Sequence, residues 1–341
     1  MNLLPIATAA FIALGISVAI FTSGPDPSES LNVAIVGNSM FYYNDCPRVL
    51  EAISGGRISQ NSTLRPSGSL NTTFLFGNKM RRIFRGGNAV KADGTYDIGA
   101  PDVPTLLLGE DYDAEGSGDG GDDDFSSSSS TPRWDFVVMN DFTRGPSDSY
   151  HKDISLQALE ELYAPLLRLT GAIPVFMSTH WFRPDISEYH GVGDIYNFTE
   201  ATYQGYEEYA ALLDFMLLEE QTPTRIAPVG RAFVRVWEED VDLWYRLFHT
   251  DGVHMSPLGT YLQACVLHCT LFGRAPFDPN VFPTEGIPTL FQRSRFMQTP
   301  PANGVAFNPF PTMEEARYLF GVAETVTLDG DALLYDADDD I

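Results

Sequence analysis

The sequence predicts a single α/β domain, a three-layer α/β/α sandwich around a central parallel sheet of about five strands. Short apolar runs alternate along the chain with longer segments of helical periodicity, which is typical of βαβ units. Two of the runs contain the continuous apolar stretches Val137–Met139 and Val175–Met177, as expected for strands that helices cover on both faces. A chain of 341 residues with 44% hydrophobic and 20% charged residues can bury one large core.

The expected elements follow one another in strand–helix order. The expected strands are Asn32–Val36, Ile58–Arg65, Phe136–Met139, Ile173–Met177 and Ile226–Val229. The expected helices are Asp45–Ser54, Thr72–Phe84, Ser155–Leu169, Glu200–Glu220, Arg231–Leu247 and Pro257–Phe272. Each strand is a short apolar run, and each helix is a longer segment with helical spacing of its apolar residues.

The last of these helices carries the strongest signals. Ser256 is a suitable N-cap, Pro257 fits the first turn, and Gly273 follows the last residue. Apolar residues recur along the segment at helical spacing, so this helix should dock on the sheet. We therefore expect His254, two residues before the cap, to be held against the rigid core.

The first residues are read as a targeting segment and not as part of the fold. Leu3–Phe21 is an apolar run without a charged residue, so residues 1–24 are expected to be a signal peptide or a signal anchor. Three Asn-x-Ser/Thr sequons, at Asn61, Asn71 and Asn197, agree with this reading. The protein is therefore expected in the secretory pathway, secreted or anchored in the membrane through this segment alone.

Two segments carry more than half of the net charge of −25. Gly109–Pro132 has eight acidic residues and no basic one, and Val326–Ile341 has six and none. We expect the first to be a disordered insertion in a domain that spans residues 31–273. Residues 274–341 are expected to wrap the domain surface and to end in a frayed acidic tail. The acidic balance argues against nucleic acid as a partner, because phosphate binding draws on clustered Lys and Arg.

Nothing in the sequence calls for a cofactor. The three cysteines, Cys46, Cys265 and Cys269, have no CxxC spacing, and the last two are expected to be buried on a helix. No Gly-rich phosphate loop is present, and the aromatic run Phe41–Tyr43 is expected to pack in the core. We expect neither a metal nor a cofactor, and the oligomeric state stays open.

Residues suited to nucleophilic acyl transfer occur at three points of the chain. The first strand leads into the turn Gly37-Asn38-Ser39, which places a serine hydroxyl at the strand's carboxyl end, where open α/β sheets bind ligands. His254 is the candidate base, and Asp251, three residues earlier in a turn, can hold the other side of its imidazole. Asn140 follows the third strand, so its amide should emerge at the same edge of the sheet.

In this order the residues resemble the motifs of the SGNH hydrolases, the GDSL-type esterase superfamily. Gly37-Asn38-Ser39 is similar to the family's first block, Gly-Asp-Ser, with Asn in place of Asp. Met139-Asn140-Asp141 is similar to its GxND block, with Met in place of Gly. Asp251-Gly252-Val253-His254 matches its DxxH block. The resemblance spans Asn32 to about Gly273 and is greatest for a branch without an assigned substrate.

The resemblance implies a flavodoxin-like SGNH hydrolase fold with a Ser-His-Asp triad. Ser39 would be the nucleophile, His254 the base and Asp251 its orienting partner. The implied oxyanion donors are the backbone N–H groups of Ser39 and Gly68 and the side chain of Asn140.

The second of these donors is the least defined part of the site. We place the family's single-glycine block at Gly68, in Pro66–Leu70, with Gly86 or Gly87 as the alternative. His180 and Trp181 follow the fourth strand at the same edge of the sheet and are expected to line the substrate cleft.

Each candidate also has a structural interpretation without chemistry. Ser39 can be a helix cap, and Asp251 can form a turn beside a surface His254. Asn140 can close the turn after its strand, and Gly68 can be a turn glycine that needs a positive φ.

The sequence thus predicts a secretory-pathway serine esterase that removes a small group, such as O-acetyl, from a carbohydrate or another small polar ester. Ser39 attacks the ester carbonyl, an acyl-enzyme forms, and water activated by His254 hydrolyses it. Two other functions stay open: an acyltransferase that uses the same triad, and a catalytically silent carbohydrate-binding module on the same fold.

Overall fold

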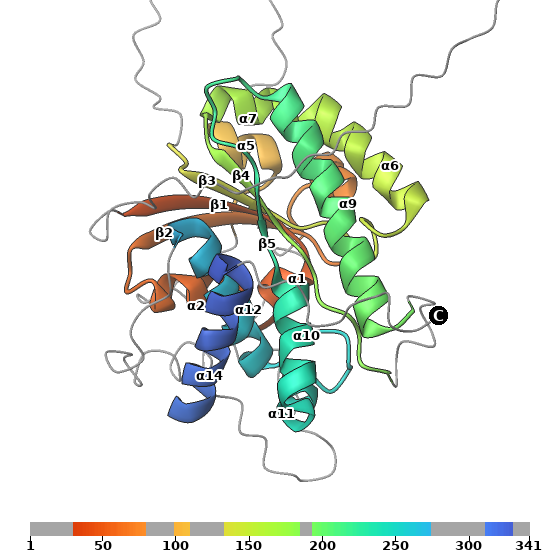
Figure 1. Cartoon of the computed structure of the whole chain (residues 1–341). Coiled ribbons are helices and arrows are strands. Elements are labelled where there is room, and N and C mark those ends of the chain that lie inside the picture. The colour runs from red at the N-terminus through yellow and green to blue at the C-terminus, as the bar shows by residue number, and fades with distance from the viewer. Residues whose placement is uncertain (1–29, 80–98, 110–132, 185–192, 274–310, 330–341) are drawn as a thin grey trace, which may run out of the picture.

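A five-stranded, fully parallel sheet forms the centre of the molecule (Figure 1). The computed structural model describes residues 30–79, 99–109, 133–184, 193–273 and 311–329. The strands are β1 (Leu31–Gly37), β2 (Ile58–Leu64), β3 (Phe136–Met139), β4 (Ile173–Met177) and β5 (Arg225–Ala227), in the spatial order β2-β1-β3-β4-β5. Helices flank both faces, so the expected three-layer α/β/α fold is confirmed.

Alternate side chains of the strands supply two separate cores. On β1, Val33 and Ile35 face one core, whereas Ala34 and Val36 face the other, as the two-residue period of a strand requires. The first core is covered by α1 (Ser39–Tyr42), α2 (Cys46–Ile53), α10 (Val229–Glu239), α11 (Val241–Arg246), α12 (Pro257–Phe272) and α14 (Met313–Glu324). The second core is covered by α3 (Leu70–Phe76), α5 (Val103–Leu108), α6 (Ser149–Ala158), a π-helical turn η2 (Leu159–Tyr163), α7 (Ala164–Thr170) and α9 (Ile195–Met216).

The strand order fixes where a ligand site can form. The chain passes from β1 to β2 on one side and then returns to β3 on the other side of β1. The loop after β1 therefore leads to one side of the sheet, and the loop after β3 leads to the other. In folds with this strand order, a crevice forms at the carboxyl ends of these two strands. Ser39 follows β1 and Asn140 follows β3, so both candidates lie at this switch point.

The best-defined helix of the sequence analysis is confirmed at both ends. α12 begins after the N-cap Ser256, whose Oγ accepts from the N–H of Gly259 at 3.4 Å, and it ends at Gly273 with a φ of 62°. All of its side chains are buried. The free thiols of Cys265 and Cys269 are among them, as expected.

Other boundaries differ from the expected ones for local reasons. The helix expected over Thr72–Phe84 begins at Leu70 and ends at Phe76, because Gly77 takes a φ of 63°. The helix expected over Arg231–Leu247 is two helices, since Asp240 leaves helical geometry and caps Leu243. The helix expected from Ser155 begins six residues earlier, at Ser149, behind the N-cap Asp148.

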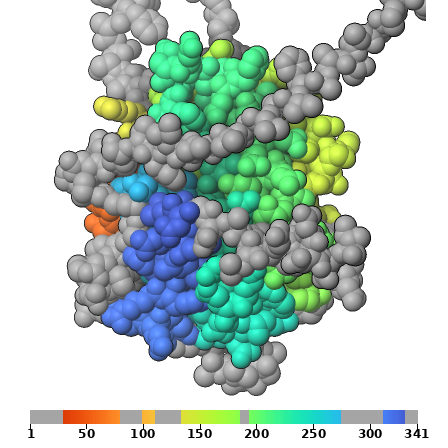
Figure 2. Space-filling model, in the orientation of Figure 1, coloured from red at the N-terminus to blue at the C-terminus, as the bar shows by residue number. Residues whose placement is uncertain are grey.

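Part of the segment after residue 273 forms a helix that packs into the core. Figure 2 shows α14 in blue beside α10 and α11 in teal. Its residues Ala316, Leu319, Val322 and Ala323 are buried in the same core as α12. Residues 313–324 therefore form a helix that is part of the core, which the expectation of a segment wrapped over the domain surface did not include.

Several expectations lie outside the described residues. These are the targeting segment 1–24, nearly all of the acidic insertion 109–132, Gly86 and Gly87, and the acidic tail. Within the described ranges, no helix has the length and apolar character needed to cross a membrane.

Candidate active site

A tight turn after β1 presents Ser39 as the first residue of α1. The N-cap is Asn38, whose Oδ1 accepts from the N–H of Met40 at 3.0 Å, so Ser39 is not the helix cap. A Cβ on Gly37 would lie 2.1 Å from Asn140 Oδ1, so only glycine fits there. Asn38 and Met40 are buried, whereas Ser39 is partly exposed. The turn thus lifts one hydroxyl out of the core.

His254 lies in a short loop between α11 and α12 that its own hydrogen bonds close. The N–H of His249 donates to the carbonyl of His254 at 2.8 Å. Gly252 takes a left-handed φ of 67°, which glycine adopts without strain. Asp251 Oδ1 accepts from the N–H of His254 at 2.9 Å. The backbone N–H of His254 therefore orients the carboxylate that lies beside the imidazole of the same residue.

The structure brings the three triad candidates into one chain of hydrogen bonds. Ser39 Oγ lies 2.9 Å from His254 Nε2, although the two residues are 215 positions apart in the sequence. His254 Nδ1 lies 2.8 Å from Asp251 Oδ2. With Nδ1 protonated and donating to the carboxylate, Nε2 is left to accept the hydroxyl proton. This is the geometry that activates a serine nucleophile.

Asp251 is held in its ionised form. Burial alone would raise the pKa of its carboxyl, but hydrogen bonds with His249 and His254 hold that pKa well below its usual range. His249 Nδ1 lies 3.3 Å from Asp251 Oδ2, the same oxygen that faces His254. One carboxylate therefore serves two imidazoles, and its charge can stabilise an imidazolium at His254.

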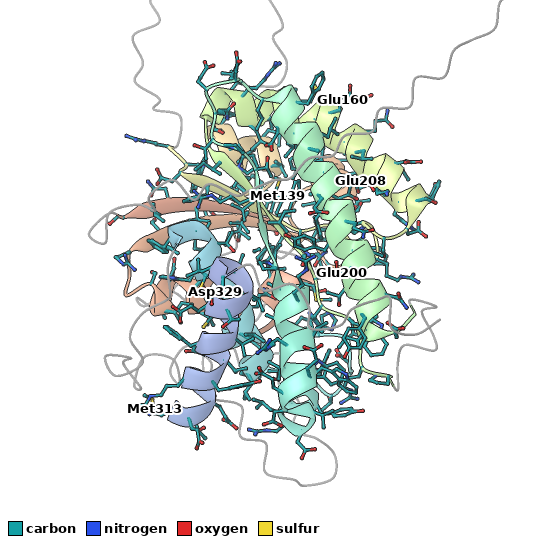
Figure 3. All side chains as sticks on the ribbon, viewed as in Figure 1. Met139, Glu160, Glu200, Glu208, Met313 and Asp329 are labelled. Carbon is teal, nitrogen blue, oxygen red and sulfur yellow. The ribbon has the colours of Figure 1, made fainter. Side chains whose placement is uncertain are left out.

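Asn140 lies behind the nucleophile turn. It directly follows Met139, which is buried and which Figure 3 labels in the interior of the molecule. Its Oδ1 accepts from the N–H of Asn38 at 3.2 Å. Its Nδ2 donates to Asn38 Oδ1 at 3.0 Å and to the carbonyl of Asp141 at 3.1 Å. Asn140 therefore holds the residue before Ser39, and both of its N–H groups have acceptors within the protein.

Gly68 also lies at the site, but its N–H has another partner. Its carbonyl accepts from Asn38 Nδ2 at 2.9 Å, whereas its N–H donates to the carbonyl of Arg65 at 3.0 Å. The residue with a positive φ in this turn is Ser67, at 53°, so the expected conformational reason for the glycine is wrong. The reason is packing, because a Cβ would lie 2.5 Å from Thr73 Oγ1.

A buried carboxylate that the sequence analysis gave no role organises the surrounding loops. Asp141 Oδ1 accepts from the N–H of Leu70 at 3.0 Å, and its Oδ2 accepts from the Tyr209 hydroxyl at 2.9 Å. Burial raises the pKa of this carboxyl in spite of these donors. The residue links the start of α3, the end of β3 and α9. The sequence contained one signal for a role of Asp141, which is its position directly after Asn140 in the block that resembles GxND.

Two amides join the chain segment around Ser39 to the segment that follows His254. Asn44 Nδ2 donates to the carbonyl of Met255, the residue after the histidine, at 2.9 Å. Gln263 Nε2 donates to the carbonyl of Met40, the residue after the nucleophile, at 2.9 Å. Both amides are buried. The sequence analysis gave neither a role, because each bond joins segments more than 200 residues apart.

His180 and Trp181 are both buried, and His180 lies against the histidine loop. Only 1% and 7% of their surfaces are exposed. The His180 ring stacks on Phe233 at 4.4 Å between centroids, and its Nε2 lies 3.1 Å from the carbonyl of Val253. Burial lowers the pKa of His180 to about 4, so this ring is neutral at neutral pH. The expectation that the two residues line a cleft is corrected: His180 supports the loop through the carbonyl of Val253, and Trp181 lies in the core with its ring centroid 6.4 Å from that of Trp244.

The described residues contain no cluster of three or more His, Cys, Asp or Glu side chains that could hold a metal ion. Cys46 is buried and free like the two cysteines of α12. Burial raises the pKa of the Cys46 thiol to about 12, which leaves it protonated and unreactive at neutral pH.

Comparison with known proteins shows a distant structural similarity. No protein-family model and no curated protein matches this chain. Among solved structures, it is similar to a DUF4886 family protein from Bacteroides uniformis ATCC 8492, with 14% sequence identity and a TM-score of 0.49. The similarity covers 79% of this chain and 94% of that chain. A similarity at this level carries no information on the chemistry of the site.

Proposed function

We propose that this protein is a serine ester hydrolase with Ser39 as nucleophile, His254 as general base and Asp251 as the group that orients the base. The observation that carries the proposal is the pair of contacts on one imidazole, 2.9 Å to the serine Oγ and 2.8 Å to the aspartate Oδ2. The position of the partly exposed serine at the switch point of the sheet supports it.

The reaction proceeds in two displacements. His254 Nε2 takes the hydroxyl proton as Ser39 Oγ bonds to the ester carbonyl carbon, and Asp251 stabilises the resulting imidazolium. The imidazolium then gives this proton to the leaving alcohol oxygen as the ester C–O bond breaks. A water molecule repeats the sequence on the acyl-enzyme, which releases the acid and restores the serine hydroxyl.

The oxyanion donors follow from the hydrogen bonds around the turn. The N–H of Ser39 stands at the first position of α1, where a helix offers it no acceptor. The second donor is the Asn140 N–H that now goes to the carbonyl of Asp141. That carbonyl also accepts from Asn38 Nδ2 at 2.9 Å, so the Asn140 N–H can turn to a substrate without leaving a buried acceptor unpaired.

Gly68 has a different part in this proposal. Transfer of its N–H to an oxyanion would open the turn that this N–H closes with Arg65. Gly68 instead supports the nucleophile turn through its carbonyl, which accepts from Asn38.

The resemblance to the GDSL-type esterases extends the proposal to a substrate class. It favours a small acyl group, such as acetyl, on a carbohydrate or another small polar ester. The apolar run at Leu3–Phe21 and the three sequons favour action in the secretory pathway. The proposed chemistry uses groups of the chain itself and water, and it needs neither a cofactor nor nucleic acid.

Hydrolysis of p-nitrophenyl acetate tests the proposal. The wild-type chain should hydrolyse it, and Ser39→Ala and His254→Ala should lower kcat/KM by about 10³-fold or more. Ser149→Ala, an exposed serine at the start of α6, should leave the rate unchanged. Equal rates in the wild type and Ser39→Ala would contradict the proposal.

A further inference from the structure

Tyr43 lies flat against the imidazole of the candidate base. The ring centroids of Tyr43 and His254 are 3.7 Å apart and the planes differ by 1°. The same tyrosine ring meets His249 edge-on at 5.8 Å. Phe41 is fully buried, as expected of a packing residue, whereas Tyr43 is only partly buried. The tyrosine therefore covers one face of the catalytic imidazole.

The backbone after Tyr43 is held in an unusual conformation. Asn44 and Asp45 have φ values of 52° and 54°, a left-handed region that residues other than glycine rarely adopt twice in succession. The conformation is maintained by Asn44 Nδ2, which donates to the carbonyl of Met255 and to Thr260 Oγ1, both at 2.9 Å. These bonds anchor the residue after Tyr43 to the segment after His254, and so fix the ring over the imidazole.

The charges around His254 define what the tyrosine can contribute. The titratable groups next to it are Asp251 and His249 from its own loop, Tyr43 from the segment after Ser39, and His180 from the segment after β4. Tyr42 contacts Ser39, and Arg183 donates to the carbonyls of Gly252 and Thr250 in the loop. Burial, with the nearby Asp251, raises the pKa of the Tyr43 phenol to about 12. At neutral pH the tyrosine therefore acts through its uncharged π face.

We infer that Tyr43 is a positioning residue that holds the His254 ring between Asp251 and Ser39 and favours its protonated form through cation–π attraction. An aromatic face attracts the imidazolium more strongly than the neutral ring. The contact itself is independent of the proposed function, but its consequence for catalysis rests on it. During acyl transfer His254 becomes an imidazolium, so the attraction is strongest when the charge has developed.

An NMR titration tests the contact without any substrate. The full chain with ¹³C-labelled histidine is titrated as wild type, Tyr43→Phe and Tyr43→Leu, and the His254 signal is assigned by its loss in His254→Ala. Leucine keeps apolar cover on the imidazole but removes the π face. The titration midpoint of His254 should fall by about half to one pH unit in Tyr43→Leu and stay near the wild-type value in Tyr43→Phe.

Two results would overturn the inference. One is equal midpoints in the wild type and Tyr43→Leu, and the other is a shift in Tyr43→Phe as large as that in Tyr43→Leu. Tyr43→Met serves as a second non-aromatic variant if the leucine variant does not fold.

The pH profile of p-nitrophenyl acetate hydrolysis separates this inference from the proposed function. In Tyr43→Leu the acidic limb of kcat/KM should move to lower pH by the same amount, and the plateau should fall about fivefold. If the acidic limb of the profile does not move in Tyr43→Leu, the role inferred for Tyr43 in catalysis is overturned. If the wild type shows no hydrolysis that depends on Ser39, the proposed function fails, while the NMR titration still decides the contact.

Discussion

At the scale of the residue, Asn38 has a side chain whose hydrogen-bonding capacity is fully used. Its Oδ1 accepts from the N–H of Met40 and from Asn140 Nδ2. Its Nδ2 donates to the carbonyls of Gly68 and Asp141, each at 2.9 Å. Asparagine fits here because it has two donors as well as an acceptor. An aspartate, which the GDSL-type motif usually has at this position, could not donate to either carbonyl once ionised.

We predict that Asn38→Asp destabilises the fold. The variant places a buried carboxylate against two carbonyl oxygens, so the free energy of unfolding should fall by about 2–3 kcal/mol at pH 7. Because this environment favours the protonated carboxyl, the deficit should shrink as the pH is lowered. Urea denaturation measures it, with Asn61→Asp on the edge strand β2, where the side chain is partly exposed, as the control. Equal losses in the two variants would contradict the prediction.

In the proposed mechanism, Asp251 acts through the tautomer that it favours at His254. In Asp251→Asn, the amide oxygen would keep the N–H groups of Val253 and His254, which Oδ1 accepts now. The amide NH₂ would then donate to His254 Nδ1 and move the ring proton to Nε2, which could no longer accept from Ser39. We predict a loss of about 10³- to 10⁴-fold in kcat/KM for p-nitrophenyl acetate with the fold retained. Near wild-type activity would show that the carboxylate does not set the tautomer.

At the scale of the element, the loop between α11 and α12 is supported from below by the segment after β4. His180 contacts the carbonyl of Val253 in this loop, and the N–H of Arg183 donates to the carbonyl of Gly252 at 3.0 Å. The support includes a histidine that is buried in its neutral form. A proton on this ring would be costly, since burial removes the charge from water.

The buried histidine predicts a loss of stability in acid. The pKa of His180 is about 4 in the fold and about 6.5 in the unfolded chain. Between these values the unfolded chain binds a proton that the folded chain does not, so its contribution to stability is complete above pH 6.5 and declines as the pH falls towards 4. The slope from this group is at most about 1.4 kcal/mol per pH unit. Urea denaturation of the wild type and His180→Gln across this range should give a flatter dependence in the variant, and parallel slopes would contradict the assignment.

At the scale of the whole molecule, a segment distant from the triad completes the core under it. α12 holds Gln263, which reaches the nucleophile helix, and α14 packs against α12 on its other side. The Tyr318 hydroxyl of α14 donates to Glu239 at 2.8 Å, and Arg246 pairs with Glu315 at 2.6 Å. From these contacts we expect α14 to unfold together with the elements of the site.

We predict that a cavity in this contact destabilises the entire domain. Leu319 is fully buried, so Leu319→Ala should lower the free energy of unfolding by about 2–5 kcal/mol. Arg317→Ala on the exposed face of the same helix should cost less than about 1 kcal/mol. Thermal unfolding followed by circular dichroism measures both. A second, separate transition for Leu319→Ala would show that α14 unfolds independently of the domain.

The sequence predicted what depends on local pattern. The five strands, the α/β/α class and the bounds of α12 rest on apolar spacing and on capping residues such as Ser256. The split of the helix expected from Arg231 was missed, because apolar residues continue past Asp240. The helix α14 was missed although Thr312 and Glu315 form a capping box, a local signal that could have indicated it.

The sequence analysis did not anticipate what depends on long-range contacts. The motif order indicated Ser39, Asp251 and His254, and these three do meet. The roles of Asn44 and Tyr43 arise from bonds and ring contacts with a loop that lies more than 200 residues away, for which no local pattern exists. The Gly68 N–H differs, since its partner is the carbonyl of Arg65 only three residues earlier, in a local turn that the sequence also did not reveal.

A fluorophosphonate probe tests the central claim most directly, because it reacts with a serine only where a base has activated the hydroxyl. The chain from residue 25 to residue 341 is treated with the probe and analysed by intact mass and peptide mapping, beside Ser39→Ala and His254→Ala. The account predicts a single adduct on Ser39 that is lost in both variants. A folded wild-type protein without an adduct, or with an adduct on another residue, would contradict it.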